Sequence, residues 1–192
     1  MPHIDVDPAL PGIRALLAFS PETASPIGEL TNLVLRSNEG LSMDDRELIA
    51  AYVSYINDCF YCHQSHGAIA ACYLNGNEEL VEKVKKDYLN AQISPKLKAL
   101  LTIAGSVTKG GKNVNTEQVD QAKNLGATDK DIHDTVLIAA LFCMFNRYVD
   151  GLGATTPSDL SSYNQRARQV AEKGYGNHVF LSKQPQNNND EN

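Results

Sequence analysis

The stretch RELIAAYVSYINDCFYCHQSHG, residues 46–67, decides the fold class of this chain. Its first half carries apolar residues at helical spacing, and Asn57-Asp58 interrupts that pattern before a second segment begins at Cys59. Ser42 precedes the first segment as an N-cap, and acidic residues follow in the first turn. We therefore expect two helices that fold back on each other as an antiparallel hairpin, with Asp58 capping the second.

The second helix carries the motif Cys59-x-x-Cys62-x-x-x-His66. Both thiols fall in its first turn, where unsatisfied backbone N–H groups and the helix dipole favour thiolate over thiol. The imidazole of His66 lies one turn beyond Cys62 on the same face. A nucleophile, a resolving partner and a base would then share one short segment, which is typical of a redox-active cysteine pair.

Glu47 is expected to join this group because of helix geometry. It lies ten residues before Asn57, and His66 lies nine residues after it. At a rise of 1.5 Å per residue these offsets are about 15 and 13.5 Å, so the hairpin brings the two side chains level. A straight continuous helix would instead leave Glu47 about 22 Å from Cys62. We predict that Glu47 hydrogen-bonds the imidazole, sets its tautomer and raises its basicity.

Helical periodicity continues along the rest of the chain, and alternating strand patterns are absent. We expect one all-α domain over residues 1–183 and a polar, Asn-rich, disordered tail over residues 184–192. The apolar run Val136–Phe145 is only ten residues long, so it favours a buried helix over a membrane span.

Composition excludes several classes of protein. The chain has 192 residues and a formal net charge of −6, which disfavours nucleic-acid or anionic-membrane partners. The N-terminal residues show no basic region followed by an apolar stretch, so we expect a cytoplasmic protein. Thiols are kept reduced there, and its four cysteines are then catalytic, metal-binding or buried rather than structural disulfides.

Glu47, eleven intervening residues and Cys59-x-x-Cys62-x-x-x-His66 resemble the core motif of the AhpD-like alkylhydroperoxidases, members of the carboxymuconolactone decarboxylase superfamily. Residues 46–67 and the stretch FNRYVDGLGA at 145–154 resemble its peroxidase-related branch, and the similarity covers most of the chain from Pro11 to Tyr175. The resemblance implies an AhpD-like helical fold with the CxxC at a helix N-terminus, and assembly into homo-oligomers.

The resemblance also implies a peroxidase of the peroxiredoxin type. Cys62 would be the attacking thiolate and Cys59 the resolving thiol, with His66 and Glu47 as a proton relay. Peroxide would oxidise Cys62 to a sulfenic acid, and Cys59 would condense with it to a disulfide that an unknown thiol reductant restores. Tyr61 departs from the family, because the well-studied peroxidase has a histidine there. This departure leaves the peroxidase efficiency and the electron donor open.

The choice of attacking cysteine rests on two opposed arguments. The helix dipole favours Cys59, as in thioredoxin-like motifs, whereas proximity to His66 favours Cys62. The resemblance agrees with proximity, and we choose Cys62.

Other chemistries remain as alternatives. Zinc would need Cys59, Cys62, His66 and a fourth ligand such as Glu47 or His63, and no second CxxC is present, so we expect no metal and no cofactor. A lactone decarboxylase would not require the dithiol, and a redox-sensing helical oligomer would need no turnover. The favoured function is reduction of a small peroxide or disulfide substrate, with no nucleic acid or membrane involved.

Overall fold

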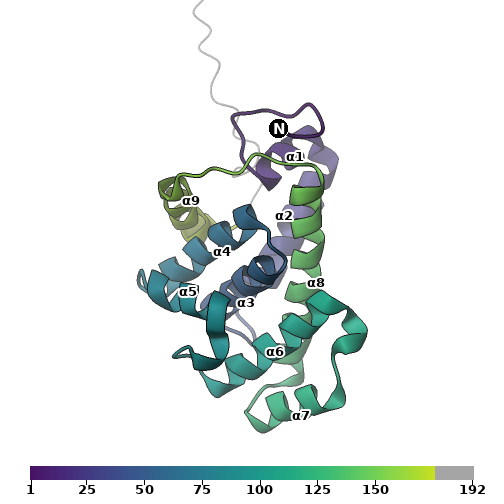
Figure 1. Cartoon of the computed structure of the whole chain (residues 1–192), viewed down its shortest axis with the longest axis vertical. Coiled ribbons are helices and arrows are strands. Elements are labelled where there is room, and N and C mark those ends of the chain that lie inside the picture. Colours follow the sequence, from purple (N-terminus) through teal and green to yellow (C-terminus); the bar gives the residue numbers. More distant parts are fainter. Residues whose placement is uncertain (176–192) are drawn as a thin grey trace, which may run out of the picture.

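The computed structural model describes residues 1–175, and every regular element in that range is helical (Figure 1). The elements follow in the order α1 (Ile13–Phe19), α2 (Pro21–Leu35), α3 (Met43–Ile56), α4 (Phe60–Tyr73), α5 (Glu78–Asp87), η1 (Tyr88–Asn90), α6 (Pro95–Lys109), η2 (Gly111–Asn113), α7 (Thr116–Asn124), α8 (Asp129–Gly151) and α9 (Leu160–Lys173). The predicted all-α fold class is confirmed. The tail predicted at residues 184–192 lies outside the described residues.

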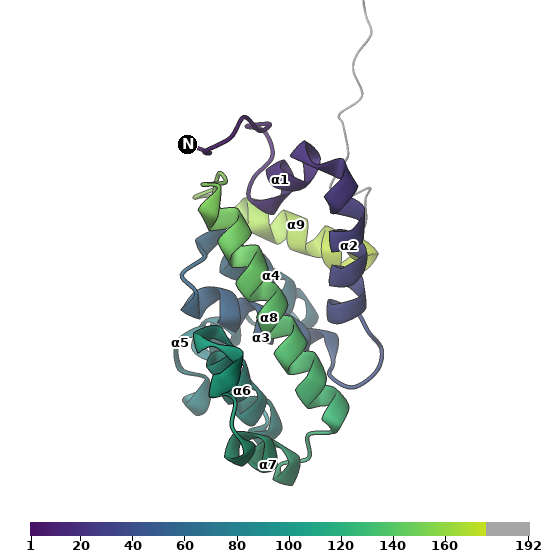
Figure 2. The ribbon, with the colours of Figure 1, turned by 90° about the vertical axis from the view of Figure 1, so that its right-hand side faces the viewer.

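Helix α3 lies at the centre of the fold. It packs against α4, α5, α6 and α8, while α9 covers the other side of α4. Figure 2 shows the long helix α8 running along the molecule in front of α3 and α4, with α2 and α9 to one side. Every residue from Arg46 to Ser54 is buried, so α3 is enclosed on all its faces. Glu47 therefore lies in the interior of the protein.

The turn between α3 and α4 differs in detail from the prediction. Ser42 caps α3 as expected, accepting from the backbone N–H of Asp45. Asp58, however, does not cap α4: its φ is +60°, and Cys59 is the N-cap residue. The short connection reverses the chain by placing one residue in the left-handed region, which aspartate tolerates better than most side chains. The antiparallel hairpin itself is confirmed.

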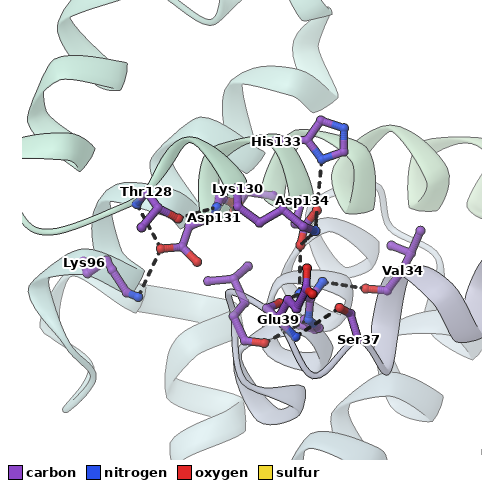
Figure 3. Close-up of polar contacts among 12 residues, drawn as sticks. Val34, Ser37, Glu39, Lys96, Thr128, Lys130, Asp131, His133 and Asp134 are labelled. Carbon is purple, nitrogen blue, oxygen red and sulfur yellow. Dashed lines mark hydrogen bonds and ion pairs between the residues drawn. The ribbon is translucent and has the colours of Figure 1, made fainter.

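Arg46, next to Glu47 on α3, is fully buried. Its guanidinium donates hydrogen bonds to Leu41 O (3.0 Å), Val34 O (2.7 Å), Glu39 O (2.6 Å) and Asp134 Oδ2 (2.8 Å). The Asp134 carboxylate also contacts Lys130 and His133 of its own helix (Figure 3). These contacts fasten the start of α3 to the end of α2, to the following loop and to α8.

Helix α8 is long and apolar enough, by length and composition alone, to cross a membrane. Half of its most apolar window is nevertheless buried inside the fold, as in the core helix of a globular protein. The predicted apolar run at 136–145 lies within this helix and supplies Ile138, Phe142 and Phe145 to the core.

Candidate active site

Cys59 and Cys62 lie together at the N-terminus of α4. The two cysteines lie 3.0 Å from each other, and both are free cysteines. Cys59 is 0% exposed and Cys62 is 4% exposed, so a substrate reaches the pair only through a narrow opening or a small movement. Because the two residues are the N-cap and the third residue of the helix, unsatisfied backbone N–H groups surround them.

The two thiols differ in their surroundings. The hydrogen bond that Cys59 shares with Cys62, together with burial and the charge of Cys62, raises the pKa of Cys59 well above its ordinary value. Cys59 also lies near Asp150 of α8, a carboxylate whose own pKa is raised by partial burial. A thiol between these groups keeps its proton. Two thiols this close do not ionise together, because a thiolate on one raises the pKa of the other.

Glu47 and His66 form a hydrogen-bonded pair across the hairpin. Glu47 Oε2 lies 2.7 Å from His66 Nδ1, and the predicted approach of these side chains is confirmed. If Nδ1 carries the proton that Glu47 accepts, Nε2 is the basic nitrogen of the ring. The edge of Phe142 packs against the imidazole at a centroid distance of 4.5 Å and restricts its rotation.

Sequence reasoning missed Tyr175, which completes this pair. Its hydroxyl donates to Glu47 Oε1 over 2.6 Å, so both carboxylate oxygens have partners. Burial and the neighbouring Glu47 carboxylate raise the pKa of Tyr175 well above its ordinary value, and the phenol remains a donor. Asn32 of α2 holds the Tyr175 backbone at both its N–H (2.7 Å) and its C=O (2.6 Å). A tyrosine two residues after the end of α9 carries no local signal for such a role.

The structure thus forms two pairs, Cys59 with Cys62 and Glu47 with His66. Among the hydrogen bonds of residues 1–175, none joins His66 to either thiol. An imidazole one turn from a thiol can exchange a proton with it through a single water, and catalytic contacts often tighten only when substrate binds.

Zinc ligation is a poor fit to the described part of the chain. No group of three or more His, Cys, Asp or Glu side chains within residues 1–175 is arranged to hold a metal ion. Glu47, the fourth ligand suggested for a zinc site, already has His66 and Tyr175 on its two oxygens.

His63, one residue after Cys62, is half-buried rather than a solvated surface residue. Its Nδ1 lies 3.4 Å from the ammonium of Lys85, a buried side chain that forms an ion pair with Glu82. The rings of Tyr55 and Phe60 pack against the imidazole. Burial and the Lys85 charge lower the pKa of His63 to about 4, so the ring is neutral at neutral pH.

The depressed pKa of His63 predicts a pH-dependent contribution to stability. The unfolded chain binds a proton on His63 near pH 6.5, whereas the folded protein binds it only near pH 4. The stability that the neutral His63 ring contributes is therefore complete above pH 6.5 and is lost as the pH falls toward 4. We expect the free energy of unfolding of wild type, relative to His63→Gln, to decrease over this window in urea titrations. Parallel pH curves for the two proteins would contradict the assignment.

Asp45→Asn provides a control of opposite sign. Burial and Asp44 raise the pKa of Asp45 to about 6, so its charged form is disfavoured in the folded protein. As the pH falls from 6 toward 4, wild type should gain stability relative to this variant.

Comparisons of the sequence and of the structure with known proteins agree on the family and the fold. A model of the Carboxymuconolactone decarboxylase family matches residues 21–84 and 73–157. One similar solved structure comes from Ralstonia eutropha JMP134 and is described as an alkylhydroperoxidase AhpD core, an uncharacterized peroxidase-related protein. It is 28% identical to this chain, and the alignment covers 83% of this chain and 82% of that one, with a TM-score of 0.73. An uncharacterized peroxidase-related protein from Silicibacter sp. TM1040 is 27% identical over 80% of this chain and 78% of that one, with a TM-score of 0.72.

A more distant structure shares the fold alone. It is a protein of unknown function from Agrobacterium tumefaciens, 19% identical over 83% of this chain and all of that one, with a TM-score of 0.68. No curated protein matches the chain. The similarity therefore supports the AhpD-like fold and a peroxidase-related or decarboxylase-type function in general.

Proposed function

Because this chain belongs to the carboxymuconolactone decarboxylase family, in its peroxidase-related branch, we propose that it reduces hydroperoxides with the Cys59–Cys62 dithiol. The observation that carries the proposal is the arrangement of two adjacent free thiols beside an imidazole paired with a buried carboxylate. A decarboxylase would have no use for the dithiol, whereas a thiol peroxidase needs both sulfurs and a proton relay.

The reaction has two balanced steps within the protein. The Cys62 thiolate attacks the terminal oxygen of the hydroperoxide, the O–O bond breaks, and the departing alkoxide takes a proton to leave as an alcohol. Cys62 is then a sulfenic acid. The Cys59 sulfur attacks it, water leaves, and a disulfide forms. An external dithiol reduces that disulfide, so one hydroperoxide and two thiol hydrogens yield one alcohol and one water.

The relay supplies the protons for these steps. His66, with Nδ1 on Glu47, takes the Cys62 proton at Nε2 and returns it to the leaving oxygen, directly or through water. Glu47 stabilises the imidazolium that forms between the two transfers. Tyr175 and Phe142 hold the carboxylate and the ring in place and act as positioning residues.

Turnover of cumene hydroperoxide by the reduced wild-type protein with dithiothreitol tests the proposal. We expect continuous, enzyme-dependent loss of hydroperoxide. Release of CO₂ from a carboxymuconolactone without hydroperoxide turnover would instead support the decarboxylase alternative. Reversible disulfide formation without turnover would support a redox sensor.

Tyr175→Phe is expected to lower kcat by about tenfold, because Glu47 loses a charge-assisted hydrogen bond of about 1.5–3 kcal/mol. Without that donor the carboxylate interacts more strongly with the imidazolium, so the acidic limb of the pH–rate profile should move to higher pH. Tyr148→Phe serves as the matched control, because Tyr148 is half-buried and packs against the apolar cluster that contains the two cysteines. An unchanged kcat and an unchanged pH profile in Tyr175→Phe would show that the phenol does not position the relay.

A further inference from the structure

Residues 3–12 form a non-helical segment ahead of α1, which we call the strap. Exposure alternates along its first half, where His3 and Asp5 are exposed while Ile4 and Val6 are half-buried. One side of the strap therefore faces the protein and the other faces solvent. Figure 2 shows this segment at the N-terminus of the chain, beside the C-terminal end of α8.

The inward side of the strap packs on the surroundings of the cysteine pair. Ile4 and Val6 contact the apolar cluster that contains Cys59, Tyr61 and Cys62. The two cysteines are 0% and 4% exposed. A reagent must touch a sulfur atom in order to react with it, so part of the cover over the pair has to move before a bulky molecule can reach it.

Few contacts hold the strap in place. Among the backbone hydrogen bonds of residues 1–175, two join it to elements beyond the adjoining α1. The N–H of His3 donates to Leu152 O over 2.9 Å, and the N–H of Gly12 donates to Thr155 O over 2.8 Å. Opening the strap breaks far fewer contacts than unfolding a core helix, and such segments open at the low end of the range of local free energies.

Gly12, at the end of the strap, rests on the cysteine motif. Its φ is +57°, and a Cβ built there would lie 2.2 Å from ring atoms of Tyr61. Only glycine satisfies both the left-handed backbone and this close approach. Tyr61 directly precedes Cys62, so the point at which the strap meets α1 is fixed against the motif.

We propose that the strap is a size filter for the Cys59–Cys62 pair, with Ile4 and Val6 as its specificity-determining residues. With the strap closed, small molecules reach the sulfur atoms, whereas bulky ones react only with the fraction of molecules in which the strap is open. The apparent rate constant of a bulky reagent is then reduced by that fraction. The favoured substrate class is a small hydroperoxide. This last assignment rests on the proposed function, whereas control of access to the thiols does not.

Alkylation of the reduced wild-type protein by N-ethylmaleimide and by the bulkier pyrenylmaleimide tests the filter without catalysis. Both reagents attack a thiolate by the same chemistry, and each rate is divided by the rate for the protein unfolded in urea. Peptide mapping by mass spectrometry resolves the rates at Cys62 and Cys72. At Cys62 we expect the normalised rate of pyrenylmaleimide to be at least about tenfold below that of N-ethylmaleimide. Equal normalised rates would overturn the proposal whatever the variants show.

Variants of the strap show whether it is the filter. Ile4→Ser/Val6→Ser should remove most of the difference between the two reagents at Cys62, because polar side chains weaken the packing on the cluster. Asp5→Ser, an exposed position on the same strap, should retain the difference. An unchanged difference in a folded Ile4→Ser/Val6→Ser protein would overturn the proposal. Acceleration at Cys72 as large as that at Cys62 would also overturn it, because the whole fold would then be loosened.

A kinetic comparison separates the filter from the proposed function. In Ile4→Ser/Val6→Ser, the kcat/KM for cumene hydroperoxide should rise at least about fivefold more than that for hydrogen peroxide. Turnover of both by wild type without such a change in the variant would leave the peroxidase standing and refute the filter. Size-selective alkylation that the variant abolishes, without turnover of any hydroperoxide by wild type, would refute the peroxidase and leave control of access standing.

Discussion

Cys62→Ser should reduce the kcat/KM for cumene hydroperoxide by roughly 10³-fold or more, because removal of a covalent nucleophile removes the reaction path itself. A serine hydroxyl is not ionised near neutral pH and cannot form a sulfenic acid. The measurement is hydroperoxide loss with dithiothreitol in excess. Cys72→Ser is the matched control, since Cys72 is half-buried near the C-terminal end of the same helix and should leave turnover unchanged.

Cys59→Ser separates the two sulfurs. Without external thiol, which would itself reduce a sulfenic acid, this variant should consume about one equivalent of hydroperoxide and then stop, leaving a sulfenic acid on Cys62 that a dimedone probe captures. Capture only on Cys59 in the Cys62→Ser protein, with Cys62 unreactive in Cys59→Ser, would reverse the assignment.

Arg46→Met should lower the free energy of unfolding by about 3–5 kcal/mol, the range for breaking a buried ion pair by removing one partner. The substitution leaves the Asp134 carboxylate without its buried partner and leaves three backbone carbonyls without donors. Urea unfolding with a fixed m-value measures the effect. Because Arg46 precedes Glu47 at the start of α3, activity should fall together with stability.

Two further variants make this prediction specific. Lys83→Met removes an exposed ion pair with Asp87 on α5 and should change stability by less than about 1 kcal/mol. Arg46→Met/Asp134→Leu should be less destabilised than the sum of the single substitutions, because no buried charge is left without its partner. A change below about 1 kcal/mol in Arg46→Met would show that its hydrogen bonds contribute little to the fold.

Local rules were sufficient for the hairpin and for the Glu47–His66 pair. The rise per residue of a helix is constant, so counting from Asn57 placed both side chains at one level without knowledge of the remaining fold. The same rules failed at Asp58, because an N-cap and a left-handed turn residue favour the same polar side chains. Only the backbone angle of +60° distinguishes the two roles.

The missed residues all depend on contacts between distant segments. Tyr175 lies 128 positions from Glu47 and is held by Asn32, which is 143 positions away. Periodicity and capping patterns describe one helix at a time, so no local pattern could have brought these residues to the site.

A single-turnover reaction of the fully reduced wild-type protein with one equivalent of cumene hydroperoxide shows whether Cys59 and Cys62 are the redox-active pair. Peptide mapping by mass spectrometry then follows the fate of each cysteine. We expect one disulfide between Cys59 and Cys62 for each hydroperoxide consumed, while Cys72 and Cys143 remain reduced. Hydroperoxide that persists, or that disappears while Cys59 and Cys62 both stay reduced, would contradict this expectation.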